Sequence, residues 1–185
     1  MNIGAITCVL AVLSVPCAAQ STRISASAMQ EYVAADLVWS RVALPENLHA
    51  DGVVRQLLEA MLERSPTFRR QCQRVGNDSR LTVHLNAIGA LWTRGARAFS
   101  DIVRSPRAMN VEIYLARAGD PVEMIAHELE HVIEQLDEVN LSARARHPDS
   151  GVRRTLASNA TFETRRASET GLKVAREVRG SLRGD

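Results

Sequence analysis

Three residues in the second half of the chain have the types and the spacing that metal chemistry requires. They are His127, Glu128 and His131, in the pattern H-E-x-x-H. Side chains four residues apart lie one above the other on a helix, so the two imidazoles can reach the same ion. Neutral imidazole is a common zinc ligand, and the pattern therefore predicts a zinc ion bound by His127 and His131. Glu128 would lie beside the ion and take a proton from zinc-bound water.

The helix that carries this motif has clear end signals. Asp120 suits the N-cap, Pro121 the first helical position and Glu123 a capping box, and the helix should continue to about Glu138. At about 100° per residue, the apolar side chains form one stripe and the two motif histidines lie roughly opposite it. They are therefore not ordinary core histidines, and the competing interpretation is a pair of exposed surface histidines. The stripe consists of Val122, Ile125, Ala126, Leu129, Val132, Ile133 and Leu136.

A catalytic zinc ion usually has three protein ligands and one open position. The third candidate is Glu163, which lies near the middle of the apolar face of a last helix predicted from about Arg154 to Arg179. An unpaired buried carboxylate costs several kcal/mol, and a zinc ion on the facing helix would compensate for that cost. The alternatives are a salt bridge from Glu163 to an arginine and a helix rotated so that Glu163 faces water.

Other acidic residues are weaker candidates for the third ligand. Glu169 lies away from the apolar face and beside Arg165, which favours a solvated ion pair. Asp137 comes six residues after His131 and, without a turn between them, lies further up the helix and away from the ion. Glu134 shares the face of the histidines, so we predict that it orients His131 through a hydrogen bond.

The remainder of the chain predicts an α+β fold, because runs of helical periodicity surround a block of alternating residues. We expect a small three-stranded sheet with a helical subdomain, in which the active-site helix packs against the long C-terminal helix. Residues 20–185 should form a single domain whose last residues, 180–185, fray. The predicted strands cover residues 81–85, 96–103 and 111–115, and the other predicted helices cover residues 29–39, 49–64 and 68–75.

Residues 1–19 have the pattern of a secretory signal peptide. The run from Ile3 to Val15 is almost wholly apolar, too short to span a bilayer, and is followed by small residues, which predicts cleavage after Ala19. The competing interpretation is a buried N-terminal helix or strand. Cleavage would give a secreted or periplasmic protein with no stable membrane insertion. It would also remove two of the three cysteines, so Cys72 would have no partner for an internal disulfide.

The composition limits the classes of binding partner that we expect. Apolar residues make up 45% and charged residues 24% of the chain, which is ordinary for a soluble globular protein. The net charge is only +2, so nothing indicates a nucleic-acid partner.

The motif, followed by a glutamate further along the chain, resembles the zincin metallopeptidases, specifically the gluzincin pattern, over about residues 111–170. The resemblance implies that His127, His131 and Glu163 bind zinc and that Glu128 is the catalytic base. It also implies an α+β fold with strands before the active-site helix, and a peptide or protein substrate. An oxyanion-stabilising residue is expected as well, and the candidates are Tyr114, His84 and His147.

Two other functions remain open from the sequence. Glu130 stands where zincin motifs normally carry an uncharged residue, and the chain is small for that family. Both features favour an exported, zinc-stabilised binding or scaffold protein without catalysis. The segment from Glu128 to His131 is also an E-x-x-H motif of carboxylate-bridged di-iron proteins, and Glu46-x-x-His49 is a second one. The second motif lies in a predicted loop, and the predicted strands do not fit a four-helix bundle.

Overall fold

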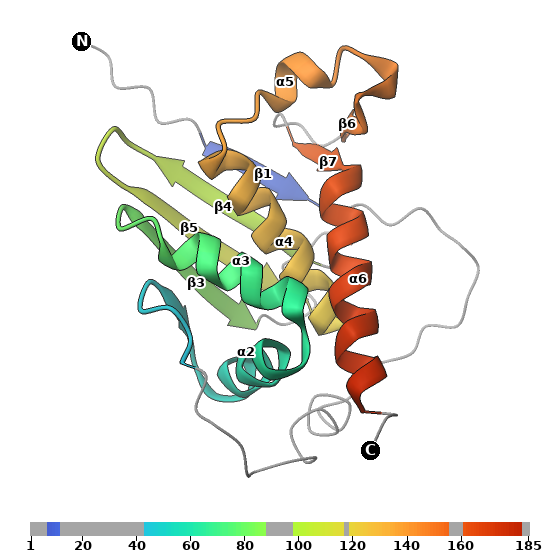
Figure 1. Cartoon of the computed structure of the whole chain (residues 1–185). Helices are drawn as coiled ribbons and strands as arrows, with labels where there is room; N and C mark the ends of the chain where they lie inside the picture. The colour runs from blue at the N-terminus through green and yellow to red at the C-terminus, as the bar shows by residue number, and fades with distance from the viewer. Residues whose placement is uncertain (1–6, 12–42, 88–97, 117–118, 156–160, 183–185) are drawn as a thin grey trace.

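The computed structural model describes residues 7–11, 43–87, 98–116, 119–155 and 161–182. In this part of the chain, a mixed sheet forms one layer and the helices gather on one side of it, with the last helix beside them (Figure 1). The α+β class expected from the sequence is confirmed. No helix of the described ranges is both long and apolar enough to cross a membrane.

The strands of the main sheet are β1 (Thr7–Ala11), β2 (Leu48–Ala50), β3 (Leu81–Ala87), β4 (Ala98–Arg104) and β5 (Met109–Leu115). Their order is β1–β4–β5–β3–β2. β4 is antiparallel to β1 and β5, whereas β5, β3 and β2 run parallel to one another. The three predicted strands correspond to β3, β4 and β5. β2 lies at the start of a segment predicted as helix and is too short for alternation to be visible. β1 lies inside the predicted leader, as the edge strand beside β4.

Alternation along the strands separates an inner and an outer face of the sheet. Val83, Val111 and Ile113 are fully buried on the inner face, toward the helices. His84 and Glu112, which pair in register between β3 and β5, point to the outer face. The hydrophobic core therefore lies between the inner face and the helices.

The helices are α2 (Gly52–Arg64), α3 (Pro66–Gly76), α4 (Pro121–Leu136), α5 (Leu141–Arg144), the 3-10 helix η2 (Pro148–Ser150) and α6 (Arg165–Ser181). α4 is the motif helix, and its start is the predicted one. Asp120 Oδ1 accepts hydrogen bonds from the backbone N–H of Val122 at 2.9 Å and of Glu123 at 3.4 Å. α4 packs against β4, β5, α3 and α6, so it is buried on nearly every side.

The last helix begins later than the sequence predicts. It starts at Arg165, because the Thr164 hydroxyl caps it by accepting a hydrogen bond from the Ala167 N–H at 3.0 Å. The residues before it form an antiparallel pair of short strands, β6 (Val152–Arg154) and β7 (Phe162–Thr164). Glu163 is therefore on a strand, and the prediction of a continuous helix from about Arg154 is wrong.

A glycine allows α4 and α6 to approach closely, as predicted for the motif helix and the C-terminal helix. A Cβ atom at Gly171 would lie 2.8 Å from the Glu123 carbonyl oxygen and 3.2 Å from the His127 Cβ. No side chain fits at these distances without a shift of one helix. The close contact lies next to the first histidine of the motif.

Cys72 lies in the core on α3, where burial raises the pKa of its thiol to about 12. This fits an unreactive structural cysteine. The predicted helix over residues 29–39 and the predicted cleavage point after Ala19 lie outside the described residues.

Candidate metal centre

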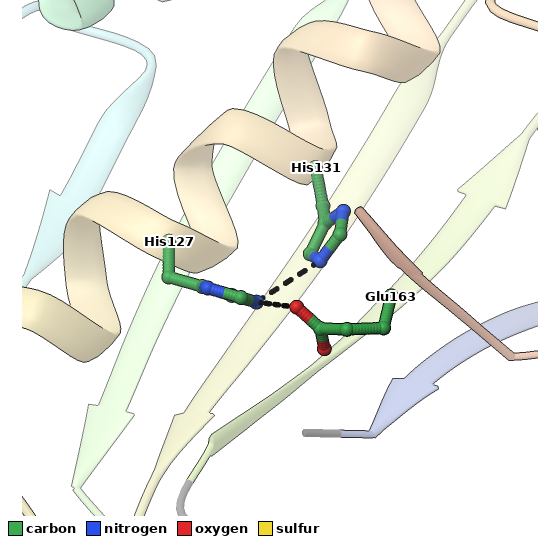
Figure 2. Close-up of side chains that lie close together, drawn as sticks. All are labelled: His127, His131 and Glu163. Carbon is green, nitrogen blue, oxygen red and sulfur yellow. Dashed lines mark hydrogen bonds and ion pairs between the residues drawn. The ribbon is translucent and has the colours of Figure 1, made fainter. Parts of the chain in front are cut away.

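His127, His131 and Glu163 converge on one point. The Nε2 atom of His127 lies 3.1 Å from Nε2 of His131 and 3.2 Å from Oε1 of Glu163. One ligand atom from each residue lies within 4.8 Å of the other two. Figure 2 shows both imidazoles projecting from the same side of α4 toward Glu163 on β7. Two nitrogens and one carboxylate oxygen at these separations could hold one metal ion.

These three side chains are largely shielded from water. The exposed fraction is zero for the His131 side chain, 8% for His127 and 12% for Glu163. The histidines lie opposite the apolar stripe, but on that side α6 packs against α4 and Glu163 of β7 contacts His127. The alternative of two exposed surface histidines is therefore wrong. Glu163 also forms no salt bridge to an arginine within the described ranges.

The short contact between His127 and Glu163 shifts both titrations. Burial alone would lower the pKa of His127, but the hydrogen bond with Glu163 and nearby carboxylates outweigh burial and raise it. Burial alone would raise the pKa of Glu163, but the His127 contact and the imidazole charges hold it below its usual value. Without an ion, the pair therefore favours a protonated imidazole beside a carboxylate.

Glu134 orients His131, as the sequence predicts. Its Oε2 atom lies 3.0 Å from Nδ1 of His131, which leaves the Nε2 atom of that ring facing Glu163 and His127. The other carboxylate oxygen, Oε1, accepts a hydrogen bond from the Thr164 hydroxyl at 2.8 Å. The role of Thr164 was not predicted. Threonine is a favourable N-cap residue, and this preference is the signal that could have identified Thr164. The predicted helix began at about Arg154, so Thr164 was not considered as a cap.

Glu128 points toward the sheet and is fully buried. The Ser100 hydroxyl, on the inner face of β4, donates a 2.5 Å hydrogen bond to its Oε2 atom. Its Oε1 atom has no hydrogen-bond partner among the described residues. Burial raises the pKa of Glu128, while the imidazoles of His127 and His131 and the Ser100 hydrogen bond oppose that rise. The carboxylate therefore has one fixed oxygen and one unpaired oxygen.

The charged residue inside the motif, Glu130, serves the packing of three helices. Its Oε1 accepts a 2.6 Å hydrogen bond from Arg166 on α6, and its Oε2 accepts a 2.7 Å bond from Gln71 on α3. Arg166 and Arg74 also pair with Asp137 at the end of α4. Neither acid belongs to the metal group, so Glu130 does not compete for the ion.

The remaining candidates lie away from the centre. Glu169 forms an exposed pair with Arg165 at 3.9 Å. His84 and Tyr114 are on the outer face of the sheet, opposite the helices, and the exposed His147 precedes η2.

The second E-x-x-H motif also lies elsewhere. Its His49 is on the outer side of β2, where it stacks on His84 at 4.7 Å between ring centroids, and Glu46 is exposed. In the described part of the chain, the second motif therefore does not join the first one at the metal group.

Comparisons of the chain with protein-family models, with curated proteins and with solved structures found no match.

Proposed function

We propose that this chain is an exported zinc-dependent metallopeptidase. The observation that carries the proposal is the convergence of His127, His131 and Glu163, with Glu128 buried next to two of these residues on the same helix. Two imidazole nitrogens and a carboxylate suit zinc better than magnesium or calcium, which prefer oxygen ligands. Three protein ligands also leave a fourth coordination position open for water or substrate.

Zinc, when bound, supplies Lewis acidity that makes water more acidic and polarises a peptide carbonyl. The protein supplies the proton transfers. Glu128 accepts the proton of the attacking water on its unpaired Oε1 and passes it to the amide nitrogen as the C–N bond breaks. Burial raises the pKa of Glu128 above its usual value, which favours the acceptance of a proton.

Ser100 and Glu134 hold the reacting groups in place. The Ser100 hydrogen bond leaves only one oxygen of Glu128 available, which restricts the direction of proton transfer. The hydrogen bond with Glu134 fixes the ring of His131 so that Nε2 serves as the ligand atom. These contacts support a preorganised site.

A zinc-stabilised binding or scaffold protein is the second candidate. It is favoured by the burial of the site, since Glu128 has no exposed surface and the ligand side chains are at most 12% exposed. In such a protein Glu128 would only contribute packing and its bond to Ser100.

The Glu128→Gln variant separates the two functions. We expect the purified protein to hold about one zinc ion, measured by elemental analysis, and to hydrolyse members of a mixed peptide library, followed by mass spectrometry. The variant should keep the zinc and lose hydrolysis, because glutamine cannot accept the proton. Glu169→Gln, which changes an exposed acid on α6, is the matched control and should retain both.

Absence of zinc binding, or unchanged turnover in Glu128→Gln, would contradict the metallopeptidase proposal. Zinc binding by a wild-type protein that hydrolyses no peptide would favour the scaffold.

A further inference from the structure

A cavity of about 350 Å³ lies between the β6–β7 pair, η2 and the first turn of α6. Its lining residues include two arginines, Arg153 and Arg165, and Ser168. No aspartate or glutamate is among the described residues that line it. The cavity is therefore positively charged.

The cavity adjoins the metal group. The Ser168 hydroxyl donates a hydrogen bond of 3.1 Å to Oε1 of Glu163. The same oxygen lies 3.2 Å from Nε2 of His127. Ser168, which lines the cavity, is therefore in direct contact with one residue of the metal group.

Arg153 lies on the Glu163 side of the strand pair. The two residues are directly opposite in the antiparallel register, so their side chains share one face. The next residue, Arg154, is on the other face, where its guanidinium lies 5.9 Å from the centre of the Phe162 ring. The side chains of Arg153 and Arg154 therefore lie on opposite faces of the strand pair and have different neighbours.

Neither the Arg153 nor the Arg165 guanidinium forms an ion pair shorter than 3.9 Å with an acid of the described residues. Arg153 is exposed and forms no ion pair with any residue in the described ranges. Among the described residues, the one ion pair of Arg165 is the 3.9 Å contact with Glu169, in which both side chains are more than two-thirds exposed. A planar guanidinium binds a carboxylate through two parallel hydrogen bonds.

We infer that this cavity binds a carboxylate of the peptide substrate, so that acidic peptides are selected. The inference rests on the proposed function, since it names the substrate class of the same site. The carboxylate comes from an aspartate or glutamate side chain or from the C-terminus of the peptide, and both present the same group to Arg153 and Arg165.

The test uses binding, so it does not require turnover. Zinc-loaded Glu128→Gln protein is immobilised and exposed to random decapeptides, half with a free and half with an amidated C-terminus. Retained peptides are then sequenced by mass spectrometry. We expect aspartate and glutamate to be enriched about three- to tenfold over the starting library. This is the effect on binding that one ion pair has, from an exposed pair to one with good geometry. Retention of peptides with a free C-terminus over amidated ones, without enrichment of aspartate or glutamate, identifies the terminal carboxylate as the ligand.

The matched variants are Arg153→Gln and Arg154→Gln in the same background. They remove the same charge from adjacent positions on opposite faces of β6. The enrichment should be lost in Arg153→Gln and kept in Arg154→Gln. Equal loss in both variants would indicate general surface charge and would overturn the inference, as would a library retained without any preference for carboxylates.

The alternative role of Arg153 is to balance the negative charge of Glu163 without contacting the peptide. In that case Arg153→Gln would change zinc affinity, measured by chelator competition, and would reduce retention of all peptides equally, which also overturns the inference. The retained acidic peptides are finally given to the wild-type protein. If they bind but are not hydrolysed, the peptidase proposal fails while the carboxylate site stands.

Discussion

Ser100 and Glu128 join β4 to α4 through a single 2.5 Å hydrogen bond between two fully buried side chains. The hydroxyl occupies Oε2 of the carboxylate and leaves Oε1 without a partner. The proposed base is thus held by the sheet rather than by its own helix. This relationship leads to the first prediction.

Replacing Ser100 by alanine should slow hydrolysis without removing the metal. We expect kcat to fall by about ten- to a hundredfold with little change in KM, because a small displacement of the base has costs of this size. Zinc content should stay near one ion per chain. Ser100→Thr keeps the hydroxyl and should restore most of the rate. An alanine variant with wild-type kcat would show that the hydrogen bond has no role in positioning.

Glu163→Gln should reduce zinc affinity by more than about a hundredfold, since loss of a mere supporting partner already costs about ten- to a hundredfold. Glu134→Gln changes only the hydrogen-bond partner of His131, so its loss of zinc affinity should be about ten- to a hundredfold. Competition with a chromophoric chelator measures both. The comparison fails if the two variants are equally affected, or if Glu163→Gln binds zinc normally.

The metal-free protein should show a pH-dependent contribution from the pair of His127 and Glu163. The raised pKa of His127 contributes stability that is present below the usual value of 6.5 and is lost as the pH rises through the folded pKa. The lowered pKa of Glu163 contributes stability that is present above the usual value of 4.5 and is lost as the pH falls through its folded pKa.

The stability difference between chelator-treated wild type and Glu163→Gln should therefore be largest between pH 4.5 and 6.5. Urea unfolding of both proteins across pH measures that difference. A difference that is flat with pH, or that grows above pH 8, would contradict the assignment of the shifts to this pair.

Gly171→Ala should force α4 and α6 apart beside the first histidine. We expect a loss of about 1–3 kcal/mol in stability, typical of overpacking, together with weaker zinc binding, because the added Cβ would contact the His127 Cβ. Gly180→Ala is the matched control on the same helix. Its Cβ meets nothing within 4 Å, so it should leave the protein as stable or stabilise it by up to about 1 kcal/mol. Thermal unfolding of the two variants provides the measurement.

The sequence predicts well those features that depend on neighbours along the chain. The cap at Asp120, the spacing of His127 and His131 and the alternation in β3 and β5 are all local. Glu163 was predicted from the cost of burying a charge on the apolar face of a helix, and the residue is buried near His127 although a strand carries it. The prediction that a helix carries Glu163 was wrong, because a strand of three residues is too short to show an alternation that can be distinguished from helical spacing.

Contacts between distant segments could not be predicted. Ser100 is 28 residues from Glu128 and looks like an ordinary inward position of a strand. Gln71 and Arg166 contact Glu130 from two other helices. From the sequence alone, the charge of Glu130 is therefore an unexplained departure from the motif. Such partners depend on how the layers pack, which no single-segment pattern records.

Thr164 has two tasks that a single hydroxyl performs at once. It accepts the N–H that opens the first turn of α6 and donates to the carboxylate that holds His131. Fraying of that turn would release the ligand ring, and an ion that fixes the ring would in return secure the turn. Metal binding at the proposed centre would therefore be linked thermodynamically to formation of the first turn of α6, and chelation should loosen that turn.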